Sequence, residues 1–264
     1  MRIALVDIDS IVIAAGALTE DVYYIVDKIR FSYKSEANAY CDEHMFSRDD
    51  IEREVDVKPV SHAINIMTTT VAAAVRETGC MEYEAYLSPN GKSNFRFNLY
   101  PEYKANRAKT VKPVHTEALR KYAIKHMGAQ VVEGMEADDM LSIRAHELGF
   151  ESAVIVSIDK DMRQVPCYHY DWKKKTPMEK VDVDSAVRNF WTQVLVGDSV
   201  DNIKGCPGIG PAKARTVLKD KTTDADMCEA VFAEYIDAYG GDEEEGKRQG
   251  VLNARLVHLL STRP

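Results

Sequence analysis

Long apolar runs are missing from this chain of 264 residues. No stretch approaches the roughly 18 consecutive apolar residues of a membrane-spanning helix. The N-terminal stretch MRIALVDIDSIVIAAG is apolar in part, but Asp7 and Asp9 interrupt it in a way that the core of a signal peptide would not tolerate. We therefore expect a cytoplasmic protein that has no membrane partner.

Paired cysteines and an overall basic charge are also lacking. The five cysteines are odd in number, lie far apart and form no CxxC pair, so neither a disulfide framework nor a zinc cage is indicated. The net charge of -8 argues, as an average, against a partner rich in phosphate. The 45% of apolar residues is ordinary for a globular enzyme, and the length fits one large domain or a domain with a small appendage.

One segment departs from this acidic average. Residues 92–125 carry a net charge of +7, and aromatic side chains are interleaved with the basic ones. A solvated loop and helix face would explain the charge alone, whereas the aromatic residues favour a surface that follows a nucleic-acid backbone and stacks on its bases or sugars. The basic residues are Lys92, Arg96, Lys104, Arg107, Lys109, Lys112, Arg120, Lys121 and Lys125, and the aromatic ones are Phe95, Phe97, Tyr100, Tyr103 and Tyr122.

Apolar periodicity predicts strands that alternate with helices. This order favours an α/β fold with a mainly parallel sheet flanked by helices. Strands are predicted at residues 3–6, 83–87, 130–132 and 153–158, and helices at 61–78, 115–127, 137–148, 185–195 and 211–218. We expect Ser61 to cap the first helix and a short helix over 101–108 to interrupt a loop over 89–113. Residues 28–58 are highly charged and show no clear period, so they are interpreted as a peripheral insertion.

The pattern becomes wholly helical after Asp184. We therefore predict a catalytic α/β domain over residues 1–183 and a helical region over residues 184–264.

Acidic residues collect where the predicted strands end. Asp7 follows the first strand, and Asp159 and Asp161 follow the strand AVIVSI. Because ligands of parallel sheets bind at the carboxyl ends of the strands, these carboxylates are expected to converge on one crevice. Aspartate also caps helices and forms turns, so this position alone leaves their function open.

Two further acidic clusters share this logic. The first of these clusters opens a predicted helix and consists of Glu136, Asp138 and Asp139. One or two acids would be enough to cap the helix, whereas three acids repel one another unless a cation neutralises them. Asp198 and Asp201 lie three residues apart. Carboxylates without histidine or cysteine point to Mg²⁺ or Mn²⁺. Two such ions would activate a water and stabilise the leaving oxygen of a phosphodiester.

A glycine-rich turn, GCPGIGPAK, lies between two predicted helices over residues 205–213. Glycine lets the backbone approach a phosphate, and Pro211 suits a first helical position next to N–H groups that bind anions. This is the form of a helix-hairpin-helix, predicted here over about residues 197–220. The residues expected to contact DNA are Gly205, Gly208, Ile209, Gly210 and Lys213.

Five motifs together resemble the 5′-nuclease and flap endonuclease family, which includes the 5′-nuclease domain of bacterial DNA polymerase I and bacteriophage 5′-3′ exonucleases. The resemblance spans residues 1 to about 220 and implies a PIN-like core with a helical arch over about residues 90–125. The motifs are VDIDS (6–10), NFRFNLYPEYKANR (94–107), EGMEADDM (133–140), SIDKDM (157–162) and LVGDSVDNIKGCPGIGPAKA (195–214).

The resemblance also implies roles for single residues. Lys104, Arg107 and Arg96 match residues that contact phosphates, while Lys92, Tyr103 and Lys109 fall in the same DNA-binding segment. Carbonyls near Ile209 would hold a K⁺ ion. One divalent metal would be bound by Asp7, Glu136, Asp138 and Asp139, and the second by Asp159, Asp161, Asp198 and Asp201.

The implied activity is metal-dependent cleavage of DNA at a 5′ end, flap or nick, with RNA in a hybrid as a further substrate. We expect a monomer that acts in phage or bacterial replication or repair.

One departure from the family pattern leaves alternatives open. Ser88 stands near the position where relatives carry a strand-end aspartate, and Asp9 is a candidate replacement. Loss of that acid would suit a DNA-structure-binding protein without catalysis. A PIN-type ribonuclease would explain the carboxylates but leaves the glycine-rich turn unexplained.

Overall fold

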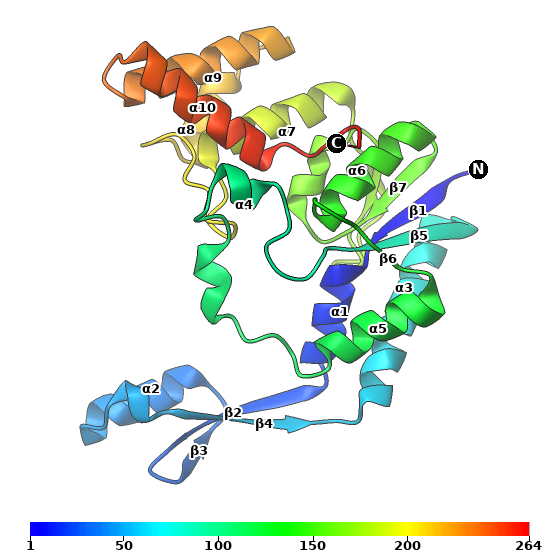
Figure 1. Ribbon diagram of the computed structural model, residues 1–264, viewed down its shortest axis with the longest axis vertical. Helices are drawn as coiled ribbons and strands as arrows, with labels where there is room; N and C mark the ends of the chain where they lie inside the picture. The colour runs from blue at the N-terminus through cyan, green and yellow to red at the C-terminus, as the bar shows by residue number, and fades with distance from the viewer. Residues whose placement is uncertain (264) are drawn as a thin grey trace.

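A six-stranded sheet forms the centre of the protein (Figure 1). The computed structural model describes residues 1–263, with the exception of the Lys109 side chain. The strand order is β6-β5-β1-β7-β8-β9, and all neighbours are parallel except β8 and β9. The strands are β1 (Ile3–Asp7), β5 (Glu82–Leu87), β6 (Gln130–Val131), β7 (Ala153–Val156), β8 (Tyr168–Tyr170) and β9 (Glu179–Lys180).

Helices cover both faces of this sheet. One face packs against α1, α3 and α5, and the other against α6. The central strand β7 is therefore apolar throughout, and β1 is apolar up to its last residue, Asp7, as expected for buried parallel strands. The predicted α/β fold with a mainly parallel sheet flanked by helices is confirmed. The helices are α1 (Ile8–Ala17), α3 (Val60–Thr78), α5 (Thr116–Met127) and α6 (Ala137–Leu148).

The start of α3 differs from the prediction. The helix begins at Val60 after Pro59, so Ser61 lies inside its first turn and does not cap it. Proline fixes its φ and suits a helix entry, which makes a side-chain cap unnecessary for starting the helix. The helix ends where Gly79 takes a φ of 69°.

Residues 20–57 fold into a small lobe that projects from the body (Figure 1). The lobe contains a three-stranded antiparallel sheet in the order β3-β2-β4. The sequence does not reveal this lobe, because eleven acidic and five basic residues obscure the alternation of its short strands. Its elements are β2 (Glu20–Val26), β3 (Ile29–Phe31), α2 (Lys34–His44), the 3-10 helix η1 (Arg48–Asp50) and β4 (Glu52–Val57).

The segment between β5 and α5 is less helical than expected. The predicted helix over 101–108 is wrong: a short helix ends at Leu99, and a 3-10 helix starts only at Ala105. Lys104 has a φ of 55°, which a continuous α-helix cannot contain. The two elements are α4 (Arg96–Leu99) and η2 (Ala105–Lys109).

The C-terminal part is helical, as expected. Its helices share a core with Tyr103 and Phe97 from the segment after β5. Within residues 1–263, no helix is both long and apolar enough to cross a membrane. The remaining elements are the 3-10 helix η3 (Lys160–Gln164), α7 (Val183–Val196), α8 (Pro211–Leu218), α9 (Asp224–Ala238) and α10 (Glu243–Val257).

Candidate functional site

The carboxyl edge of the sheet brings the first acids together. Asp7 is the last residue of β1, and its carboxylate accepts hydrogen bonds from Ser10 N at 3.4 Å and from Ser157 Oγ at 2.9 Å. Ser157 directly follows β7, the parallel neighbour of β1, and precedes Asp159 by two residues. Sequence reasoning missed Ser157, although its place at the end of a buried strand was a usable signal.

Six of the eight predicted metal-binding acids line one small pocket. The hollow measures about 30 Å³, which is enough for an ion or a water molecule. Arg96 and Tyr103 lie on one side of it, and Asp7 lies close enough to raise the pKa of Asp138. The six acids are Glu136, Asp138, Asp159, Asp161, Asp198 and Asp201.

One side of this pocket carries negative charge without matching cations. Burial and then the neighbouring Asp9 raise the pKa of Asp7 to about 6. Burial, followed by the charges of Asp7, Asp159 and Glu136, raises the pKa of Asp138 well above its usual range. Burial and Asp159 raise the pKa of Asp161 to about 6, although Lys160 Nζ lies 3.0 Å from it. Bringing a cation into this side would relieve the repulsion.

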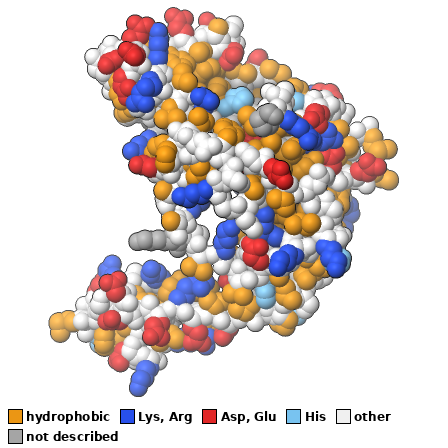
Figure 2. Space-filling model, viewed as in Figure 1, with side chains coloured by type: hydrophobic (Ala, Val, Ile, Leu, Met, Phe, Trp, Pro, Cys, Tyr) orange, Lys and Arg blue, Asp and Glu red, His pale blue; other side chains and the backbone are white. Residues whose placement is uncertain are grey.

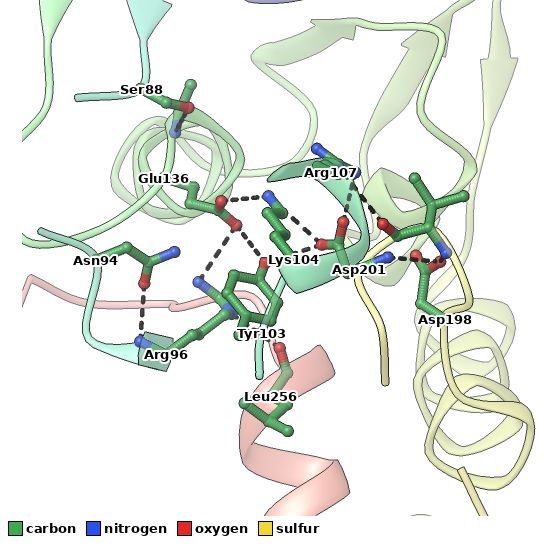
Figure 3. A network of polar contacts seen from close by, with 12 residues as sticks. Ser88, Asn94, Arg96, Tyr103, Lys104, Arg107, Glu136, Asp198, Asp201 and Leu256 are labelled. Atoms are coloured by element: carbon green, nitrogen blue, oxygen red, sulfur yellow. Dashed lines mark hydrogen bonds and ion pairs between the residues drawn. The ribbon is translucent and has the colours of Figure 1, made fainter. Parts of the chain in front are cut away.

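The other side of the pocket is held by basic side chains (Figure 3). Lys104 Nζ donates to Glu136 and lies 3.5 Å from Asp201, and Arg107 Nη2 donates to Asp201 at 2.5 Å. The Tyr103 hydroxyl lies 2.8 Å from both carboxylates and donates its proton to one of them at a time. Burial alone would raise the pKa of Glu136, but Lys104 and Arg96 outweigh it, and that pKa is lowered.

The backbone at Lys104 joins the two halves of the site. Its N–H donates to the Asp201 carbonyl at 2.9 Å, across 97 residues of sequence. Its φ of 55° is uncommon for a residue with a side chain and is kept only where the surroundings hold it. This conformation directs the ammonium group toward Glu136 and Asp201.

Arg96 and Asp139 form a buried ion pair instead of facing the pocket separately. The guanidinium donates twice to Asp139, at 2.6 and 2.9 Å, and also to the carbonyls of Leu256 and His258. Arg96 is 2% exposed and Asp139 is fully buried. The prediction that Arg96 meets a phosphate is therefore corrected, because its donors are occupied in the interior. Asp139 neutralises Arg96 and accepts from Glu136 N at 3.0 Å.

The predicted DNA contact of Tyr103 is also corrected. Its ring is 2% exposed and packs edge-on against Phe97, with centroids 5.3 Å apart, so it cannot stack on a base. Its function in the structure is to orient Glu136 and Asp201 through the hydroxyl. Lys92 is exposed with its Nζ 5.6 Å from the Phe97 ring. The side chain of Lys109 lies outside the described residues.

Ser88 supports the helix that carries the central acids. Its hydroxyl accepts from Ala137 N at 3.0 Å, at the start of α6. Its N–H donates to Asp9, and its carbonyl accepts from Arg120 at 2.6 Å. Arg120 also donates to Asp9 at 2.5 Å. The candidate replacement acid, Asp9, is therefore already paired with Arg120.

The glycine-rich turn brings α7 and α8 close together. Gly197 and Gly205 both have positive φ, and a side chain on either would come within 2.5 Å of the other's backbone. Gly210 and Pro211 start α8, whose first turn has no side-chain cap. Ile209 is buried, Gly208 has a φ of 74°, and Lys213 lies 3.1 Å from Glu234. The first-turn N–H groups of α8 are thus suited to a phosphate.

The donor set of the pocket fits a hard divalent cation. All of its candidate ligands are carboxylates, which Mg²⁺ and Mn²⁺ prefer. Among residues 1–263, no three acidic, histidine or cysteine side chains are yet drawn together as a complete metal cage. Glu136 and Asp201 are held by Lys104, and the charges of Asp7, Asp159 and Glu136 act on Asp138.

The chain is similar to known proteins in sequence and in fold. A family profile described as "5′-3′ exonuclease, N-terminal resolvase-like domain" matches residues 24–190. DNA polymerase I of Bacillus caldotenax is 33% identical over 199 residues, which cover 66% of this chain and 22% of that protein. A 5′-3′ exonuclease of Mycoplasma pneumoniae is 33% identical over 147 residues, which cover 49% of this chain and 50% of that protein. The chain thus matches at most half of either relative.

Solved structures share the fold at lower sequence identity. A bacteriophage T5 5′-exonuclease with bound zinc ions is 17% identical and superimposes with a TM-score of 0.55, covering 97% of this chain and 90% of that one. A bacteriophage T5 flap endonuclease in a complex with DNA and metal ions is 16% identical, with a TM-score of 0.58 and the same coverage. The match extends over the sheet and the C-terminal helices.

Proposed function

The chain belongs to the 5′-3′ exonuclease family, and on this basis we propose that it is a divalent-metal-dependent nuclease that hydrolyses DNA phosphodiester bonds near a 5′ end. The proposed activities are 5′-3′ exonuclease and structure-specific flap endonuclease. The substrates are DNA with a 5′ end, flap or nick, and RNA primers in a hybrid. The protein acts as a monomer in phage or bacterial DNA replication or repair.

The observation that carries this proposal is the meeting of under-neutralised acids and basic side chains at one pocket. The pKa of Asp138 is raised by burial and by three neighbouring acids, while Lys104 and Arg107 lie on the opposite side. A phosphodiester needs cations on its oxygens and a base for the attacking water, and both are available within this pocket.

The acids divide into two metal-binding sets. One ion would be held by Asp7, Glu136 and Asp138. Asp139 could reach this ion only if its ion pair with Arg96 were broken. When bound, two Mg²⁺ or Mn²⁺ ions supply an activated water and neutralise charge on the phosphate. The second ion would be held by Asp159, Asp161, Asp198 and Asp201.

Lys104 and Arg107 have a direct role in this proposal. Both donate to Glu136 or Asp201, and if those carboxylates bound a cation instead, the two donors would be available to a phosphate oxygen. Preorganised donors of this kind stabilise the charge that develops in the transition state. Buried Tyr103 keeps Glu136 and Asp201 in place during the exchange.

Duplex DNA would be held by the helix-hairpin-helix. The uncapped start of α8 offers backbone N–H groups to a phosphate, and carbonyls near Ile209 would hold a K⁺ ion. The surface is hollowed between the lobe and the helical region, and lysine and arginine side chains line its wall (Figure 2). A single-stranded 5′ end would follow this basic wall to the pocket.

The second candidate function is DNA-structure binding without catalysis. The observation that favours it is Ser88, whose hydroxyl caps α6 and supplies no carboxylate. Retention of all the other acids supports the nuclease, because binding alone is better served by basic residues in their place.

One assay separates these functions. End-labelled 5′-flap, nicked and blunt duplexes are incubated with Mg²⁺, Mn²⁺ or EDTA, together with the Asp138→Asn variant. We expect short products with 5′-phosphates in either metal, none in EDTA, and cleavage by the variant that is at least about 100-fold slower. Tight flap binding without turnover in both metals would identify a binding protein instead.

A further inference from the structure

Three consecutive lysines follow β8 and have no role in the site described above. Lys173, Lys174 and Lys175 are all exposed. Lys174 pairs with Asp171 at 3.1 Å, whereas within the described residues neither Lys173 nor Lys175 forms an ion pair. Two cationic side chains are thus displayed without partners on a protein whose net charge is -8.

The loop that carries these lysines has a defined shape. The Asp171 carboxylate accepts from the N–H groups of Lys173 at 3.0 Å and Lys174 at 2.9 Å. Lys175 then has a φ of 54°, which turns the chain back toward β9. The backbone of this loop is therefore held in place, while its lysine side chains remain exposed.

The lysines border a hollow of about 610 Å³ between this loop and α3. A hollow of this size matches those that bind small ligands or a nucleotide. Its lining includes aromatic and basic side chains and a single acid, next to threonine and alanine residues of α3, and the first two kinds of side chain suit a base and its phosphate. The residues concerned are Tyr170, Trp172, Lys173, Lys175, Arg76 and Glu77.

A chain of hydrogen bonds connects this hollow to the carboxylate pocket. Trp172 Nε1 donates to Ser10 Oγ at 3.3 Å, and Ser10 Oγ donates to the Asp7 carbonyl at 3.0 Å. In the sheet order β5-β1-β7-β8, the basic segment leaves from β5 and the lysine loop from β8. The acids at the ends of β1 and β7 therefore lie between two basic surfaces.

We propose that residues 171–176, with Trp172 and the facing part of α3, form a second DNA-binding surface that holds one nucleotide of the substrate beside the carboxylate pocket. Trp172 stacks on the base or sugar, and Lys173 and Lys175 contact its phosphates. This inference rests on the proposed nuclease function. A solvated loop would explain the lysines alone, but it leaves unexplained the hollow that Lys173 and Lys175 border and the half-buried position of Trp172 beside it.

The first test removes the two unpaired charges. The Lys173→Gln/Lys175→Gln variant is compared with Lys28→Gln/Lys34→Gln, which removes two exposed lobe lysines and also changes one residue with positive φ. Affinity for a labelled 5′-overhang duplex is measured by fluorescence anisotropy in EDTA at several salt concentrations. We expect the loop variant to bind about tenfold more weakly with a salt slope lower by about two, and the lobe variant to change less than about twofold.

Cleavage kinetics in Mg²⁺ give a second readout of the same pair. The loop lysines do not touch the reacting atoms, so we expect KM to rise about tenfold while kcat stays within about twofold. If both double variants weakened DNA binding equally, the effect would be due to net charge alone, and the proposal would be overturned. Unchanged affinity in the loop variant would overturn it as well.

The second test separates stacking from packing at Trp172. Trp172 also packs against the core, so Trp172→Phe and Trp172→Leu are used because both keep apolar bulk. We expect phenylalanine to bind within about threefold of the native protein and leucine to bind about five- to tenfold more weakly, because only the former keeps a π-face. Equal affinity of the two variants would exclude stacking.

The proposed function and this surface fail in distinguishable ways. If the native protein cleaves DNA and the loop variants bind DNA as tightly as the native protein does, only the proposal of a second DNA-binding surface is overturned. Native protein that neither binds nor cleaves DNA overturns both.

Discussion

The two sides of the carboxylate pocket differ in how their negative charge is balanced. On the paired side, Glu136 and Asp201 are bound by Lys104, Arg107 and the Tyr103 hydroxyl. On the unpaired side, Asp7 and Asp138 have only hydroxyl and backbone donors or no strong partner, and burial raises the pKa of both. Burial raises the pKa of Asp201 as well, but Lys104 and Arg107 act against this rise. Burying charge without a counter-ion is costly, so the unpaired side is where a cation stabilises the fold most.

The buried ion pair of Arg96 and Asp139 shows the same contrast between paired and unpaired charge. Arg96 lines the pocket and Asp139 lies behind it, and the pair that they form joins α4 and α6 to the end of α10. Motif residues in one cluster therefore serve two purposes: some hold the structure, and others are left charged for a ligand.

The largest expected effect concerns this buried pair. Arg96→Gln leaves the Asp139 carboxylate buried without its partner, so we expect the free energy of unfolding to fall by about 3–5 kcal/mol. Chemical denaturation followed by circular dichroism measures this change. The control is Arg163→Gln, whose pair with Glu179 at 2.6 Å is about half exposed and worth less than about 1 kcal/mol. Similar losses in the two variants would contradict a structural role for Arg96.

The second prediction concerns the unpaired side. Asp138→Asn removes a repelled carboxylate, so we expect the metal-free protein to be at least as stable as the native one. Cleavage of a flap substrate should nevertheless fall by at least about 100-fold, because a metal ligand is lost. Asp27→Asn in the exposed lobe is the control and should cleave normally. If the Asp138→Asn variant were less stable than the native protein but still active, the assignment of Asp138 as a repelled metal ligand would be wrong.

The third prediction concerns the paired side. Lys104→Gln removes a donor to Glu136 and Asp201, and we expect kcat to fall about 100-fold with little change in KM. Lys247→Gln, which disrupts an exposed pair on α10, is the matched control. Single-turnover cleavage measures both. A rise in KM with kcat unchanged would show that Lys104 only binds substrate.

The smallest expected effect concerns Ser88. Ser88→Ala removes a cap from α6, so we expect the free energy of unfolding to fall by about 1 kcal/mol. Cleavage should stay within a few-fold of the native rate, because the hydroxyl is directed at Ala137 N. A large loss of cleavage with unchanged stability would instead place Ser88 at the metal.

Much of the fold could be predicted because local signals and tertiary packing agree. The strand AVIVSI and the helix 137–148 have clear apolar patterns, and α6 ends at Leu148 before Gly149 as expected. The lobe over residues 20–57 could not be predicted, because its small core depends on Val26, Ala37 and Cys41 meeting across highly charged segments.

The acids that belong to the site could be predicted from the sequence, but the basic residues that pair with them could not. A strand end, a helix start and the turn after α7 together contribute six acids to one pocket. The burial of Arg96 and the packing of Tyr103 on Phe97 depend on contacts with α10 and α7. These helices are distant in sequence from both residues. Periodicity carries no information about which basic residue of a charged segment pairs with which acid.

Metal-dependent stabilisation tests the central claim most directly. Thermal unfolding of the native protein and of Asp138→Asn is measured with increasing Mg²⁺ or Mn²⁺ and without DNA. Binding to the folded state alone should stabilise the native protein by about 2.7 kcal/mol at a metal concentration 100-fold above Kd, and the variant far less. An equal response of the two proteins, or none in either metal, would contradict a cation site on the unpaired side.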